Sequence, residues 1–256
     1  MNDPHVVTLT YALETADTIS FDGAEPLRHE TAEFELHLAD GILVATPKGH
    51  FASVAEARNS LDSLLRSWTL NAALNSGRSE IWFKYKDAEV IDRHPPPAGT
   101  SRVLKADFAG VASAVGDITV KVNRTHYPDP SLEFVATPDV ESLWHRFEGY
   151  RSGREPLLSM SYFCLTFIES IFGGRDNAAI QLGFSKEVLS KLGELTSTHG
   201  DTKSARKFSS GNPQSPLTHS EARWIEEIVR WIIRRLGEAA TGAPLSQITM
   251  ADLPTI

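Results

Sequence analysis

Hydrophobic positions alternate with polar ones over the first fifty residues, and the alternation returns near residue 81. Between these stretches the period changes: Ser53 with Glu56 forms a capping box, and apolar residues every three or four positions predict a helix that ends near Gly77. β-branched and aromatic residues are typical of strands. The strand candidates are HVVTLTYAL, TAEFELHLADGILVA, EIWFKYKDAEVIDR, RVLKADFAGVA and DITVKVNRTHY. The pattern predicts an α+β domain, with at least five strands in a mixed or antiparallel sheet around one long helix.

From Thr137 onward the strand pattern gives way to a helical period. Residues 157–172 are apolar on nearly every side, which is typical of the central helix of a bundle. This stretch of 16 residues is shorter than the roughly 20 that a bilayer requires, so we expect no membrane span. The further helix candidates are VESLWHRFEGYRSG, DNAAIQLG, SKEVLSKLGEL and HSEARWIEEIVRWIIRRLGEAA. We predict an α+β domain over residues 1–137 and an all-α helical bundle over residues 138–256.

The net charge and the single cysteine limit which kinds of partner and which cellular compartment we expect for this protein. The formal net charge is −8, and the acidic excess lies in the first 149 residues, which argues against a protein that coats nucleic acid. The single cysteine, Cys164, lies in the apolar stretch and is expected to be a buried hydrophobe. One cysteine permits no internal disulfide, and the first residues show no signal-peptide pattern, so a cytoplasmic location is expected.

Motifs for cofactors and metals are absent from the sequence. It contains no GxxxxGK[ST], GxGxxG or HExxH motif, so we expect no cofactor and no metal. The nearest metal-like cluster is RHETAEFELH. On one strand, Glu33, Glu35 and His37 would share a side, together with His29. A cation site there is conceivable, but a solvated strand face is the expected reading.

Basic residues gather in two places of the C-terminal half. Lys203, Arg206 and Lys207 lie in a polar loop, and Arg230 and Arg234 lie toward the end of the last long helix. Together they could contact the phosphates of a nucleic acid. The alternative is a solvated loop and a helix end whose dipole favours cations.

The helical half resembles HEPN domains of bacterial abortive-infection proteins. The resemblance covers roughly residues 140–240 and is carried by YFCLTFIES, VLSKLGELTSTHG and PLTHSEARWIEEIVRWIIRRL. It implies a helical fold, pairing into a homodimer and a role in bacterial defence or stress. HEPN ribonucleases carry an arginine shortly before a histidine, whereas none of the nine histidines here has an arginine five to seven positions before it. The chain is also similar to bacterial proteins that share YRSGREPL, KLGEL and QITMADLP, a likeness that names no function.

Two features of the helical half give specific expectations. Glu169 shares a helix side with apolar residues, so we expect a buried ion pair with Arg175 or Arg230. Trp224 and Trp231 are seven residues apart on one helix edge and could anchor a homodimer through the helical domain, the alternative being that both are core.

Three functions stay open at this point. The leading interpretation is a non-catalytic binding or scaffolding module, because no familiar catalytic motif is present. The second is a diverged HEPN-type ribonuclease that uses His199, Arg206 and His219. The third is a small-molecule or nucleotide sensor that binds its ligand through the N-terminal domain.

Overall fold

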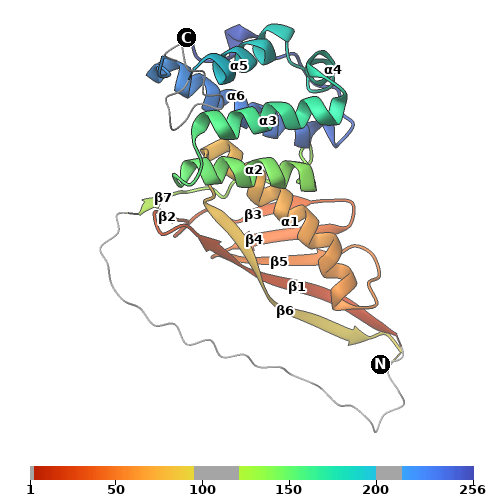
Figure 1. Cartoon of the computed structure of the whole chain (residues 1–256). Coiled ribbons are helices and arrows are strands. Elements are labelled where there is room, and N and C mark those ends of the chain that lie inside the picture. Colours follow the sequence, from red (N-terminus) through yellow and green to blue (C-terminus); the bar gives the residue numbers. More distant parts are fainter. Residues whose placement is uncertain (1–2, 95–120, 200–214) are drawn as a thin grey trace. The chain divides into compact units, whose positions relative to one another are not determined.

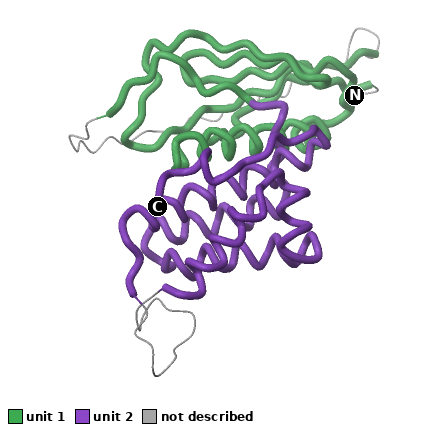
Figure 2. The backbone as a smooth tube through the Cα atoms, turned by 90° about the horizontal axis from the view of Figure 1, so that it is seen from above, with its two compact units in different colours: residues 1–130 green, residues 131–256 purple. Residues whose placement is uncertain are grey.

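The chain forms two compact units, residues 1–130 and residues 131–256 (Figure 2). The computed structural model describes residues 3–94, 121–199 and 215–256. The expected division into an α+β part and a helical part is confirmed. Along the chain, the division between the units falls between Pro130 and Ser131, a few residues before the predicted boundary at Thr137. The strand candidate RVLKADFAGVA lies outside the described residues.

The first unit is built on a five-stranded antiparallel sheet with strand order β3-β4-β5-β1-β6 (Figure 1). A separate pair of two-residue strands, β2 and β7, runs parallel. The strands are β1 (Pro4–Thr15), β2 (Ile19–Ser20), β3 (Leu27–Glu30), β4 (Phe34–Ala39), β5 (Ile42–Pro47), β6 (Ile81–Asp92) and β7 (Val122–Asn123).

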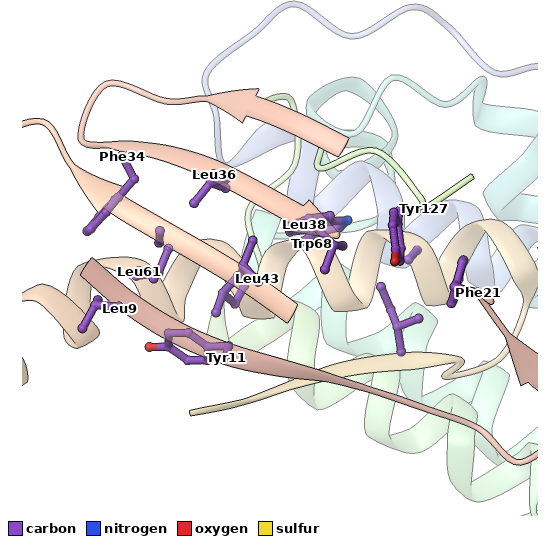
Figure 3. Packing of buried hydrophobic residues seen from close by; sticks show 14 of the residues in the cluster. Leu9, Tyr11, Phe21, Phe34, Leu36, Leu38, Leu43, Leu61, Trp68 and Tyr127 are labelled. Carbon is purple, nitrogen blue, oxygen red and sulfur yellow. The ribbon is translucent and has the colours of Figure 1, made fainter. Parts of the chain in front are cut away.

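One face of the sheet packs against helix α1 (Val54–Ser76). Ser53 caps the helix by accepting a hydrogen bond from the Glu56 amide at 3.2 Å, and Gly77 ends it in the left-handed conformation. Inward residues of the strands and one face of α1 form the core shown in Figure 3. Its largest members include Tyr11, Phe34, Leu43, Leu61 and Trp68. Alternation along each strand therefore sends every second side chain to the opposite, outer face of the sheet.

Two turns set which residues reach that outer face. Asp40 and Gly41, both with positive φ, form the tight turn between β4 and β5. A second turn, over residues 31–33, separates β3 from β4, so that RHETAEFELH forms two strands instead of one. As a result Arg28 lies directly opposite His37, and Glu30 lies opposite Glu35.

The second unit is helical. Its helices are α2 (Pro138–Arg151), α3 (Leu157–Phe172), α4 (Arg175–Gln181), α5 (Lys186–Thr198) and α6 (His219–Ala239), followed by the short 3-10 helix η1 (Met250–Asp252). Thr137 caps α2 through the Val140 amide, and Thr218 with Glu221 forms a complete capping box at α6. Ser185 precedes α5, but its side chain makes no capping hydrogen bond.

Helix α3 lies at the centre of this unit and contacts each of α2, α4, α5 and α6. Leu158, Cys164, Leu165 and Ile168 are buried, whereas Ile171 is 44% exposed. Its apolar surface is therefore buried on most of its circumference but not all round. None of the described helices is long and apolar enough to cross a bilayer by itself. Helices α3 and α4 together have the length and apolar composition of a span, but the chain bends by 84° between them.

The segment after α6 is fastened to the helices by a buried arginine. Arg235 donates from Nη2 to the backbone oxygen of Ser246 at 2.8 Å and to its hydroxyl at 3.1 Å. Its Nη1 donates to Glu238 at 2.9 Å, and the side chain is only 7% exposed. Further along, Ile248 exchanges backbone hydrogen bonds with the connection between α4 and α5, at Gly183 and Ser185. The C-terminal segment is thus part of the packed unit.

Candidate functional site

A hollow of about 470 Å³ lies on the outer face of the sheet, over β3, β4 and β5. The charged or titratable side chains on its wall that are exposed are those of Arg28, Glu30, Glu35 and His37. Val44 forms part of its floor. It is lined by the outward residues Arg28, Glu30, Glu35, His37, Val44 and Thr46, and by parts of His29 and Leu36, which alternate with them along the strands. We call this the outer-face groove. Because its walls are neighbouring strands of one sheet, its polar groups stand on rigid backbone.

The register of the strands explains the order of charges in the groove. Arg28 faces His37 across β3 and β4, and His37 faces Val44 on β5. One residue pair further along, Glu30 faces Glu35, an arrangement that is unfavourable because like charges stand directly opposite. Lys48 binds the Glu30 carboxylate at 3.0 Å and neutralises that half of the pair. Glu35 is left as the unbalanced carboxylate.

Three groove side chains make no hydrogen bond or ion pair within the described residues: Arg28, Glu35 and His37. A guanidinium and an imidazole side by side can bind an anionic group such as a carboxylate or phosphate, the guanidinium in bidentate fashion. The adjacent carboxylate of Glu35 can accept from an ammonium or amide of the same ligand. The Thr46 hydroxyl, opposite Glu35, adds a donor and acceptor.

The members of RHETAEFELH do not gather on one face as the sequence suggested. His29 pairs with the buried Leu36 and so lies on the inner side of the sheet, where its Nε2 is buried and finds no hydrogen-bond partner in the described part of the chain. Glu33 precedes β4 and accepts a hydrogen bond from Ser60 of α1. The reason is the turn at residues 31–33, which starts a new strand and resets the alternation. Only Glu35 and His37, with Glu30, share the outer face, and Arg28 and Thr46 are members that the sequence did not single out.

A second polar cluster, also not anticipated, joins the ends of β1 and β6. His5 Nδ1 lies 3.1 Å from His50 Nδ1, and Asp3 lies 3.1 Å from His94 Nδ1 and 3.6 Å from His50 Nε2. Arg93 contacts His50 at 3.2 Å. These groups are distant in sequence, so spacing gives no hint of them. In the described part of the chain, no group of three or more histidine, cysteine, aspartate or glutamate residues is arranged to hold a metal ion.

Of the three residues considered for ribonuclease activity, the structure describes His199 and His219. His199 ends α5, with Nδ1 3.2 Å from the Ser215 carbonyl oxygen and Nε2 3.8 Å from Glu221. Hydrogen bonds from the amide and then the hydroxyl of Thr218 hold the pKa of Glu221 below its usual range. His219 is exposed on the first turn of α6, and Arg206 lies outside the described residues. The geometry therefore links His199 to the start of α6, and among the described residues no arginine pairs with it.

The basic residues proposed for phosphate contact are occupied or lie outside the described residues. Arg230 pairs with Glu227 on its own helix, one turn earlier. The guanidinium of Arg234 lies 5.5 Å from the centre of the Trp231 ring, and burial lowers its pKa. Lys203 and Lys207, like Arg206, fall in residues 200–214.

Glu169 has one of its two expected partners. Arg175 Nε donates to Glu169 Oε1 at 2.6 Å, across the Gly-Gly break between α3 and α4. Arg230 is not a partner, because its guanidinium bonds to Glu227. The side chains of Arg175 and Glu169 are 37% and 24% exposed, so the pair is half-buried and not buried as predicted.

Cys164 and Trp224 are core residues. Cys164 is fully buried, and burial raises the pKa of its thiol to about 12. Trp224 is also fully buried, so it cannot anchor an interface, whereas Trp231 is half-buried. Comparison of the chain with protein-family models, with curated proteins and with solved structures finds no match.

Proposed function

We propose that the protein is a non-catalytic binding module whose α+β unit takes a small ligand in the outer-face groove. The ligand would carry an anionic group for Arg28 and His37 and a cationic or donor group for Glu35. This joins two of the functions that the sequence left open, a binding module and a sensor that acts through its N-terminal domain. The observation that carries the proposal is that Arg28, Glu35 and His37 share one hollow and have no partner among the residues that the structure describes.

The surroundings strengthen this argument. Two other carboxylates of the same face are paired within the described residues: Glu30 with Lys48 at 3.0 Å, and Glu14 with Lys84 at 3.4 Å. Arg28 and Glu35 have no such partner within the described residues, which leaves two groups of opposite charge in the groove available for a ligand. Zwitterionic molecules such as amino acids and their derivatives match that pattern, because each bears both a carboxylate and an ammonium group.

A thermal-shift screen of anionic, cationic and zwitterionic metabolites tests the proposal. A ligand present at 100 times its Kd stabilises the folded state by about 2.7 kcal/mol. We expect zwitterionic ligands to raise the melting temperature of the wild type, and Arg28→Gln and Glu35→Gln each to abolish the shift. The matched control is Arg154→Gln, which removes an exposed arginine of the helical unit and should leave the shift unchanged.

Two results would contradict the proposal that a ligand binds in the outer-face groove. One is a ligand that stabilises Arg28→Gln as much as the wild type. The other is a screen in which no compound bearing an anionic group has any effect. The ribonuclease alternative is tested beside it by incubation with mixed RNA, and cleavage that disappears in His199→Ala would establish an enzyme instead.

A further inference from the structure

Strand β6 is a long strand at the edge of the sheet. It pairs with β1 along one side over its whole length of 12 residues, and no other described strand pairs with its other side (Figure 1). A strand edge of this kind presents a row of unpaired N–H and C=O groups, which can form a ladder with another strand. Two of its large apolar side chains, Trp82 and Ile91, are 40% and 44% exposed.

A bulge at the middle of β6 changes which side chains face outward. Thr10 pairs with Asp87 and Tyr11 pairs with Tyr85, so Lys86 is an extra residue on β6. Before the bulge the outward residues have even numbers, and after it they have odd numbers. The outward residues are Trp82, Lys84, Lys86, Asp87, Glu89 and Ile91.

This pattern makes β6 complementary to a second copy of itself. In an antiparallel pair with its two-fold axis between Lys86 and Asp87, Lys84 meets Glu89 and Lys86 meets Asp87 of the other chain. Trp82 then meets Ile91, so the two exposed apolar groups cover each other. A strand without a bulge could not pair in this register, because residues whose numbers add to an odd sum would face opposite sides of the sheet.

We propose that the protein forms a two-fold dimer through β6, which joins the two sheets into one continuous ten-stranded sheet. The charge sequence of the strand, with Lys84 and Lys86 on one side of the two-fold axis and Asp87 and Glu89 on the other, selects a second copy running in the opposite direction. The proposal moves the expected dimer from the helical half to the α+β unit, because Trp224 is buried in the helical core. A seam of two strands is smaller than the interface of a permanent dimer, so association should depend on concentration.

A charge-swap experiment tests the pairing and its direction. The first variant is Lys84→Glu with Lys86→Glu, and the second is Asp87→Lys with Glu89→Lys. Each variant alone places like charges opposite each other, so we expect its dimer to be at least about tenfold weaker than that of the wild type. Mixed together, the two variants restore every opposite-charge pair and should form a heterodimer.

Sedimentation velocity across a dilution series gives the readout, and circular dichroism checks that each variant is folded. A wild type that stays at 28.2 kDa at the highest concentration would overturn the proposal. So would variants that each dimerise as well as the wild type, since the contact would then lie elsewhere.

Cysteine cross-linking tests the register independently and does not require the charge variants to fold. Trp82→Cys and Ile91→Cys should form a disulfide with each other when mixed, because cross-strand neighbours have their Cβ atoms about 5 Å apart. Neither variant should cross-link with itself, and the native Cys164 is fully buried and gives no background. Cross-linking of Ile91→Cys to Lys84→Cys in preference to Trp82→Cys would refute this register, and no cross-link at all would refute the seam.

Discussion

Replacing Gly237 with alanine is the sharpest test of packing in the helical unit. Gly237 lies in the last turn of α6, and the ring of Phe134 packs directly on it. A Cβ added there would lie 2.2, 2.6 and 2.8 Å from three ring carbons of Phe134, closer than carbon atoms approach in folded proteins. The ring is only 3% exposed, so it has no free space into which to move.

The expected magnitude follows from two opposing terms. Alanine is favoured over glycine in a helix by about 1 kcal/mol, whereas overpacking a filled core costs about 1–3 kcal/mol. Because three ring carbons clash and the ring is enclosed, we expect a net loss of about 1–2 kcal/mol. Gly149 is the matched control: it lies in the last turn of α2, and its added Cβ would meet only Glu155 at an ordinary 3.8 Å. Gly149→Ala should therefore stabilise by up to about 1 kcal/mol.

Urea denaturation followed by circular dichroism measures both variants against the wild type. Opposite signs for the two substitutions support the packing described here. If Gly237→Ala is as stabilising as Gly149→Ala, then Phe134 does not pack on α6. A double variant, Phe134→Leu with Gly237→Ala, should lose less than the sum of the two single changes, because the smaller side chain leaves room for the methyl group.

Three further predictions concern ionisable groups. Because burial raises the pKa of Cys164 to about 12, the thiol should stay unreactive toward an aromatic disulfide reagent at pH 8 until urea unfolds the chain; rapid reaction of the native protein would contradict its burial. Glu169→Ala should cost about 1 kcal/mol in calorimetry, not the 3–5 kcal/mol of a fully buried pair, since Arg175 and Glu169 are both partly exposed. Burial, then the hydrogen bond to Glu226, raises the pKa of the Tyr150 phenol to about 12, above its unfolded value of about 10. The folded state thus favours the neutral phenol, so this stabilisation is complete below about pH 10 and is lost as the pH rises toward 12. Urea titrations at several pH values should show a smaller loss in Tyr150→Phe than in the wild type, because Cys164, whose pKa is also raised by burial, keeps its own contribution in both proteins.

Local signals predicted the helices closely. The cap at Ser53, the apolar run at residues 157–172 and the stop at Gly77 all appear in the structure. Such signals involve residues three or four positions apart, so they can be read from the sequence before the fold is known. The Asp40-Gly41 turn is equally local, since both residues tolerate positive φ.

The groove could be predicted only in part. Glu30, Glu35 and His37 stood out as polar residues in a strand pattern, but the turn at residues 31–33 has no glycine or proline to mark it. Without that turn, Arg28 could not be placed opposite His37. The cluster of His5, His50 and His94 could not be predicted for a related reason: successive members lie about 45 residues apart, and they meet only because β1 pairs with both β5 and β6.

The buried arginine of α6 has a consequence for anyone who shortens or labels this protein. Arg235 reaches the segment after the helix at Ser246, and two of its hydrogen bonds end there. Cutting the chain just before Ser246 would leave Nη2 of a nearly enclosed cation without those acceptors, a loss that is far larger than that of an ordinary frayed end. Affinity tags and fluorophores therefore belong after Ile256, where the chain is exposed, and a truncated version should be recovered from cells in lower yield.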